Sequence, residues 1–242
     1  MKHFPYDDKH HSHTLKDELF FHLPYAVFAI AFSLIILSFF DFLAIGKSSQ
    51  QLAAVRWQMF HSFHFMHIAF ACVGTLLTFF KYSRSIIKGM FVGIISPSIF
   101  CVLSDMVFPW LGAKILGINM PLHICFFNEI GNILPFLVIG FITGLVLSSQ
   151  RYLGEQDQHS HNSDFVIWSH SAHIFISSLA SSFYFVANGF TNWSDSIGMV
   201  FVVLIFAVLI PCTLSDVIIP AFCAKLGDKT NHKNCSESCR KK

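Results

Sequence analysis

Six long apolar stretches constrain this chain more than any other feature of its sequence. A transmembrane helix needs about 20 apolar residues to cross roughly 30 Å of hydrocarbon. Only 12% of the 242 residues are Asp, Glu, Lys or Arg, which is half of the about 25% that soluble domains carry. The sequence therefore predicts an all-α polytopic membrane protein with six transmembrane helices. The expected spans are Leu23–Ile45, Trp57–Phe80, Ile86–Phe108, Ile133–Ser149, Phe165–Val186 and Ile197–Ile219.

The positive charges predict the orientation of these spans. All Lys and Arg residues except Lys47, Arg56 and Lys114 lie in the N-terminal segment, the second loop, the fourth loop or the C-terminal tail. Cytoplasmic loops carry the excess of Lys and Arg, so both termini are expected in the cytoplasm and the protein in the plasma (inner) membrane. The net charge of +2 provides no basic surface for a nucleic acid, which we exclude as a partner.

A duplicated motif relates the two halves of the chain. Residues 101–114 read Cys-Val-Leu-Ser-Asp-Met-Val-Phe-Pro-Trp-Leu-Gly-Ala-Lys, and residues 212–225 read Cys-Thr-Leu-Ser-Asp-Val-Ile-Ile-Pro-Ala-Phe-Cys-Ala-Lys, so seven of fourteen positions match at a spacing of 111 residues. A Glu that precedes Leu-Pro and the pattern His-Ser-x-His also occur once in each half. Self-similarity of this kind is typical of an internal repeat.

Each copy contains three spans, so the second copy must be inverted in the membrane relative to the first. We therefore expect a fold of two inverted-topology repeats. Inverted repeats are typical of secondary transporters, which bind their substrate at the repeat interface. The sequence divides into a His-rich cytoplasmic N-terminal segment 1–22, a first repeat 11–117 that overlaps it, a second repeat 118–227 and a cytoplasmic tail 228–242.

The matched polar residues predict two similar clusters, one near each face of the membrane. The outer cluster would contain His61, His64, Asp105, His123 and Glu129. The inner cluster would contain His170, His173, Asp216 and Glu18, with His11 or His13 in the place of His123. The other histidines of the cytoplasmic segments, among them His22, are assigned no necessary role, and Asp41 and Asp195 are expected in solvated loops.

These residue types favour a divalent transition metal as the ligand. Histidines three apart lie on one helix face, and imidazole with carboxylate suits Zn²⁺, Fe²⁺, Mn²⁺ and Co²⁺. Ionisable residues are costly in a membrane and therefore mark functional paths. His67 has Ile176 as its counterpart, and it is a candidate either for the outer shell of the metal or for an asymmetric ligand. Purely structural roles are the alternative to metal binding. The two Asp carboxylates can bind backbone amides near the following Pro. For Cys101 and Cys212, helix packing is favoured over metal ligation.

The leading functional hypothesis is binding and transport of a divalent metal of the Zn, Fe or Mn class. The alternatives are a metal-dependent membrane hydrolase, in which Glu129 or Asp105 is the general base, then a dihaem cytochrome, then a scaffold without chemistry. The expected partners are the metal ion and the lipid bilayer, and a second copy of the chain is a further candidate.

Overall fold

The computed structural model describes residues 15–126, 128–153 and 161–226, and all regular structure among them is helical. Short π and 3₁₀ segments interrupt the α-helices. In chain order the elements are α1 (Leu15–Leu43), α2 (Ser49–Tyr82), α3 (Ile86–Val102), the π segment η1 (Leu103–Val107), α4 (Phe108–Ile115), α5 (Ile130–Leu153), α6 (His161–Ala187), the 3₁₀ segment η2 (Trp193–Ser196), α7 (Ile197–Thr213) and the π segment η3 (Leu214–Ile218).

Five helical runs among the described residues are long and apolar enough to cross a membrane. They are Lys16–Leu43, Ser49–Tyr82, Ile86–Ile115, Ile130–Ser149 and Trp193–Leu226. The predicted all-α membrane class is thus confirmed. The span expected at Phe165–Val186 falls in α6, which is not among these five runs.

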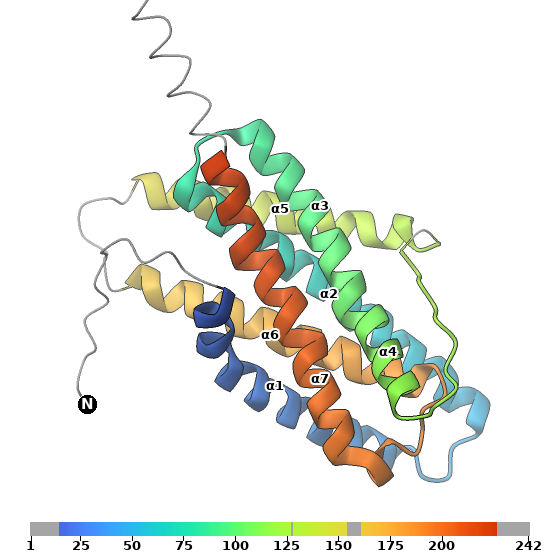
Figure 1. The fold of residues 1–242 in the computed structure, drawn as a ribbon. Helices are drawn as coiled ribbons and strands as arrows, with labels where there is room; N and C mark the ends of the chain where they lie inside the picture. The colour runs from blue at the N-terminus through green and yellow to red at the C-terminus, as the bar shows by residue number, and fades with distance from the viewer. Residues whose placement is uncertain (1–14, 127, 154–160, 227–242) are drawn as a thin grey trace, which may run out of the picture.

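Helices α2 and α6 form the centre of the bundle and pack against each other. In addition α2 packs against α5, whereas α6 packs against α1. Helix α7 and the continuous α3–α4 run lie side by side and cross in front of α2 and α6 (Figure 1). The first helix of each half therefore packs mainly against the second helix of the other half.

Large apolar side chains cover much of the outside of this bundle. Phe28, Phe32 and Phe91 are more than half exposed, and many Ile and Leu side chains face outward in the same way. Exposed apolar area on this scale indicates contact with lipid or with another protein. The surface therefore agrees with a bundle that belongs in a membrane.

The two Leu-Ser-Asp motifs both form π helix. In η1 the N–H of Phe108 donates to the carbonyl of Leu103, and in η3 the N–H of Ile219 donates to the carbonyl of Leu214. The physical reason is the proline four residues after each Asp. Pro109 and Pro220 have no N–H, and a proline ring clashes with the carbonyl four residues before it. Each helix therefore widens locally at its buried Asp, as π bulges at functional sites do.

Glycines allow α2 to approach two of its neighbours closely. A Cβ atom at Gly140 of α5 would lie 2.6 Å from the backbone oxygen of Ala69, and one at Gly144 would lie 2.7 Å from a methyl group of Leu76. These two glycines form the G-x-x-x-G spacing that permits tight helix pairs in membranes. On another face of α2, a side chain at Gly74 would collide with the Asp216 carboxylate.

Asp41 does not lie in a solvated loop, as the sequence had suggested. It belongs to the last turn of α1, where its carboxylate accepts hydrogen bonds from Arg56 and from the Trp193 indole, each at 2.9 Å. These bonds connect α1 to α2 and to η2. Asp195 does lie exposed, within η2.

Candidate metal centre

The first half of the chain places two histidines on one buried carboxylate. His64 and His67 lie one turn apart on α2, and their Nδ1 atoms lie 2.8 and 2.7 Å from Oδ2 of Asp105. The other oxygen, Oδ1, accepts hydrogen bonds from Ser104 at 2.8 Å and from Ser177 of α6 at 3.3 Å. Asp105 is completely buried and is held by hydrogen bonds on both of its oxygens.

The second half repeats part of this arrangement. The Nδ1 atom of His173 forms a short hydrogen bond with Oδ2 of Asp216, and Nδ1 of His170 lies 3.4 Å from the same oxygen. In contrast to Asp105, Oδ1 of Asp216 is buried without a hydrogen-bond partner among the described residues. A buried polar atom without a partner is costly and calls for an explanation.

His67 joins the two halves. Its Nε2 atom lies 2.6 Å from Nε2 of His173, and 3.7 Å from Sγ of Cys212 on α7. The partners predicted within each half do meet, but His67 connects them, so the buried residues form one continuous series and not two separate clusters. The reason is the length of the helices: α2 begins at Ser49 and α6 at His161, so the motif histidines lie near the middle of each helix, where α2 and α6 pack together.

The hydrogen bonds set which nitrogen of each ring is available to a ligand. A carboxylate oxygen can only accept, so the Nδ1 atoms of His64, His67 and His173 carry hydrogen and the Nε2 atoms remain as acceptors or ligands. The contact of 2.6 Å between Nε2 of His67 and Nε2 of His173 therefore requires a proton shared by the two atoms, because two lone pairs at this distance would repel each other. The Nε2 atoms of His61, His64 and His170 are buried without a partner among the described residues.

The charge of this cluster favours a cation. Two carboxylates are buried in it, and among the described residues only histidines form ion pairs with them. Buried charges are expensive unless they are paired or coordinate a metal. A carboxylate that orients the imidazole of a metal ligand is the usual outer shell of a protein metal site. One divalent cation would balance the two negative charges.

Two groups of three residues have ligand atoms close enough to bind one ion. One is His67, His173 and Cys212, and the other is His170, His173 and Asp216; within each group all ligand atoms lie within 4.8 Å of one another. His173 belongs to both groups. These residues, which come from α2, α6 and the α7–η3 run, constitute the candidate metal centre.

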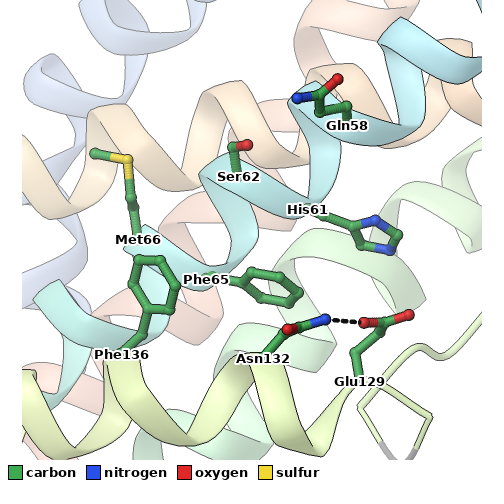
Figure 2. Close-up of a pocket in the computed structure, with 8 residues that line it drawn as sticks. All are labelled: Gln58, His61, Ser62, Phe65, Met66, Glu129, Asn132 and Phe136. Carbon is green, nitrogen blue, oxygen red and sulfur yellow. Dashed lines mark hydrogen bonds between the residues drawn. The ribbon is translucent and has the colours of Figure 1, made fainter.

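The side chains of His61, His64, His67, His173 and His170 follow one another through the bundle, and we call this series the buried chain. A pocket of about 490 Å³ lies at one end of the buried chain, between α2 and α5 (Figure 2). The side chains of His61 and Glu129 face the same region of it, and Glu129 accepts a hydrogen bond of 2.6 Å from Asn132. The outer predicted cluster is thus divided, because His61 and Glu129 line the pocket while His64 and Asp105 lie deeper. The lining residues are Gln58, His61, Ser62, Phe65, Met66, Glu129, Asn132 and Phe136.

His123 does not reach the buried chain. It is exposed in the segment between α4 and α5, where its backbone exchanges two hydrogen bonds with the Tyr184 hydroxyl. Its ring packs edge-to-face on Trp57, with ring centroids 4.9 Å apart. Trp57 also contacts the ring of His61, at 5.6 Å between centroids, so His123 lies at the rim beyond the pocket residues.

His22 covers the opposite end of the buried chain, beside His170. The sequence did not predict this position. His22 is 6% exposed, and its ring centroid lies 4.2 Å from that of His170. Its Nδ1 atom donates to the backbone oxygen of Glu18 at 2.6 Å and lies 3.8 Å from the Glu18 carboxylate. Glu18 therefore approaches the inner residues through His22. The suggested ligands His11 and His13 lie outside the described residues.

The sequence did not show that two residues, His67 and Cys212, lie at the centre of the site. His67 has no counterpart in the second half, and Cys212 shares its motif position with Cys101. Cys101 is buried against apolar residues such as Phe65 and Ile68, as expected for packing, whereas Cys212 faces His67. The sequence signal for His67 was its spacing, because it follows His61 and His64 at intervals of three residues on α2.

Comparisons with known proteins add no further information about this site. A scan against protein-family models found no match, and searches for similar curated proteins and similar solved structures found none either. The chemistry of the buried chain is therefore the basis for assigning a function.

Proposed function

We propose that this protein is a membrane transporter for a divalent transition metal ion, and that the ion passes along the buried histidines. The observation that carries the proposal is that His173 belongs to two adjacent ligand groups. An ion bound at Nε2 of His173 together with His67 and Cys212 can pass to the Nδ1 side of the same ring, where His170 and Asp216 lie, once His173 gives up its hydrogen bond to Asp216. A structural or catalytic metal site, which keeps its ion in one place, needs no second set of ligands.

The arrangement of the helices supports an inverted repeat with six spans, in which α6 is the fifth span along the chain. Both Asp motifs form π helix at the same place in their halves. The exchanged packing of α1 on α6 and of α5 on α2 relates the halves as an inverted pair would. The polar residues of α6 that are buried in the bundle are His173, Ser177, Ser178, Ser181 and Ser182. A transporter holds its substrate path among buried polar residues of this kind.

The path that we propose begins at the pocket beside His61. From there His64 and His67 follow on α2 at intervals of three residues, and His173 and His170 continue on α6. The buried Nε2 atoms of His61, His64 and His170 lack hydrogen-bond partners among the described residues, so each can bind a passing ion without breaking a hydrogen bond. With both termini in the cytoplasm, the pocket faces outward and His22 faces the cytoplasm of a cell with this protein in its plasma membrane.

Metal flux into proteoliposomes tests this proposal. The wild-type protein is reconstituted into vesicles that contain a zinc-sensitive dye, beside Asp105→Asn/Asp216→Asn and, as a control, His123→Ala at the rim. We expect saturable zinc flux in the wild type and the control, and loss of the flux in the double variant. Flux equal to that of protein-free vesicles in all three preparations would contradict transport.

One observation favours a hydrolase as the second candidate, because His61 and Glu129 face a pocket large enough for part of a substrate (Figure 2). A hydrolase would need Glu129 as a base and would not need the residues beyond His67. Loss of a lipid- or peptide-cleaving activity in Glu129→Gln, with full activity in Asp216→Asn, would favour it. A haem between His67 and His173 is disfavoured by their contact of 2.6 Å.

A further inference from the structure

We propose that the centre of the buried chain of histidines is a metal site with mixed imidazole and thiolate ligands. These ligands are Nε2 of His67, Nε2 of His173 and Sγ of Cys212. The substrate would accordingly be a thiophilic divalent ion of the zinc class, and not a hard ion such as Mn²⁺ or Mg²⁺. This inference rests on the proposed transport function and names the substrate class of its central site. It also assigns Cys212 a role other than helix packing.

The three ligands come from three helices and are nearly inaccessible to solvent. His67 and His173 are each 1% exposed, and Cys212 is 2% exposed. Tetrahedral Zn²⁺ has Zn–N distances of about 2.0–2.1 Å and Zn–S distances of about 2.3 Å, which separate neighbouring N and S ligands by about 3.6 Å. The observed Nε2–Sγ distance of 3.7 Å for His67 and Cys212 already fits this geometry.

The two imidazoles need only a small movement to complete the site. Their Nε2 atoms are 2.6 Å apart, whereas two nitrogen ligands of tetrahedral zinc are about 3.3 Å apart. Both rings are oriented from behind by carboxylates, His67 by Asp105 and His173 by Asp216. This outer shell fixes the tautomer that offers Nε2 to the ion.

The thiol has a hydrogen-bond partner that remains useful after its proton has left. Cys212 donates to Oγ of Ser177 at 3.3 Å, and Ser177 donates to Oδ1 of Asp105 at 3.3 Å. Only the thiolate binds a metal strongly, so binding releases the Cys212 proton to solvent as the S–M bond forms, and the proton shared by Nε2 of His67 and Nε2 of His173 leaves as the two N–M bonds form. The Ser177 hydroxyl can then rotate and donate its hydrogen to the thiolate, while Oδ1 of Asp105 keeps the hydrogen bond of 2.8 Å from Ser104.

Cys101 provides the matched comparison. It occupies the same position in the other Leu-Ser-Asp motif and is equally buried, but it packs among apolar side chains. Thiolate ligands favour zinc-class ions, whereas carboxylate and water suit Mn²⁺ and Mg²⁺. A preference for zinc over manganese should thus depend on Cys212 and not on Cys101.

Cobalt spectroscopy of the full-length protein tests this inference. Co²⁺ is added to purified protein that carries Cys235→Ser and Cys239→Ser, which removes the two tail thiols, and to the same protein with Cys212→Ser or Cys101→Ser. We expect a near-ultraviolet sulfur-to-cobalt charge-transfer band in the parent and in Cys101→Ser, and its absence in Cys212→Ser. The preference for Zn²⁺ over Mn²⁺ should fall at least about tenfold in Cys212→Ser alone.

X-ray absorption at the zinc edge gives a second measurement that needs no variant at Cys212. The parent protein with one equivalent of Zn²⁺ should show one sulfur ligand at about 2.3 Å. Zinc bound and transported with only nitrogen and oxygen ligands would overturn the thiolate site and leave the transport proposal intact. No binding and no flux of zinc or cobalt would overturn both.

Discussion

The two ends of the buried chain differ, although the sequence duplicates their residues. At one end His61 faces a pocket between α2 and α5. At the other end its counterpart His170 is covered by His22 of α1. One end of the path is thus accessible from a cavity and the other is covered. An alternating-access transporter requires this asymmetry in any single state, because opening both ends at once would create a channel.

The two carboxylates differ as well. Asp105 has hydrogen bonds on both of its oxygens, whereas Asp216 leaves Oδ1 without a partner among the described residues. Asp216 also belongs to a group that can bind an ion directly, and Asp105 does not. The comparison assigns Asp105 to the support of histidine ligands and Asp216 to both support and ligation.

The largest effect is expected from His173→Ala, because this residue belongs to both ligand groups. Zinc affinity should fall by more than the about 10–100-fold that loss of an outer-shell partner costs. Isothermal titration calorimetry measures it, with His123→Ala as the matched control. An affinity within threefold of the wild type would remove His173 from the site.

The single carboxylate variants test the difference between the two halves. Asp105→Asn removes one buried negative charge and weakens the orientation of two imidazoles, and we expect about 10–100-fold weaker zinc binding. Asp216→Asn should weaken binding further, because it also removes a ligand. Titration of both variants side by side measures this order. Equal losses would mean that the two carboxylates have one role.

Much of this site could be predicted from the sequence, and the remainder depends on helix packing. The motifs identified His64, Asp105, His173 and Asp216, because charged and imidazole groups are rare in apolar spans and are therefore informative. Sequence spacing could not indicate that α2 and α6 cross at His67, since the contact depends on the approach of two helices that are far apart in the chain.

Two contacts of the site could not be read from the sequence, for similar physical reasons. His22 was assigned to a cytoplasmic segment because the apolar run begins at Leu23, but α1 begins eight residues earlier, at Leu15. Cys212 and Cys101 are indistinguishable within their motifs, and only their neighbours on other helices separate them. Local patterns identify which residues are unusual, whereas their partners depend on the tertiary fold.

Gly74→Ala is expected to disturb the Asp216 half selectively. The added methyl group would collide with the Asp216 carboxylate, and overpacking of this kind costs about 1–3 kcal/mol. Gly198→Ala is the control, because a Cβ atom there has no neighbour within 4 Å. Thermal unfolding in detergent should give a lower Tm for Gly74→Ala alone. An unchanged Tm would show that the carboxylate can move away at little cost.

Chemical labelling can test which end of the buried chain of histidines is accessible to solvent. Single variants His61→Cys and His22→Cys, treated with a water-soluble maleimide, should react faster at position 61, which lines the pocket, than at buried position 22. The native Cys125 contributes little background, because burial raises the pKa of its thiol to about 12. Faster labelling at position 22 would reverse the assignment of the open end.

The smallest effect is expected from Asp41→Asn. This change weakens the bonds to Arg56 and Trp193 at the end of α1. The ion pair is partly exposed, and pairs of this kind contribute about 0.2–1 kcal/mol. Thermal unfolding should show a slightly lower Tm with unchanged zinc affinity. A large loss of affinity would indicate that this contact controls the distant metal centre.

The position of a bound ion tests the central claim most directly. Crystals of the full chain soaked in Zn²⁺, with anomalous diffraction recorded at the zinc edge, would locate each bound ion. The account predicts a peak within coordination distance of a ring nitrogen of His173, either at Nε2 beside His67 and Cys212 or at Nδ1 beside His170 and Asp216. Zinc at the exposed histidines alone, with His67 and His173 still in direct contact, would contradict it.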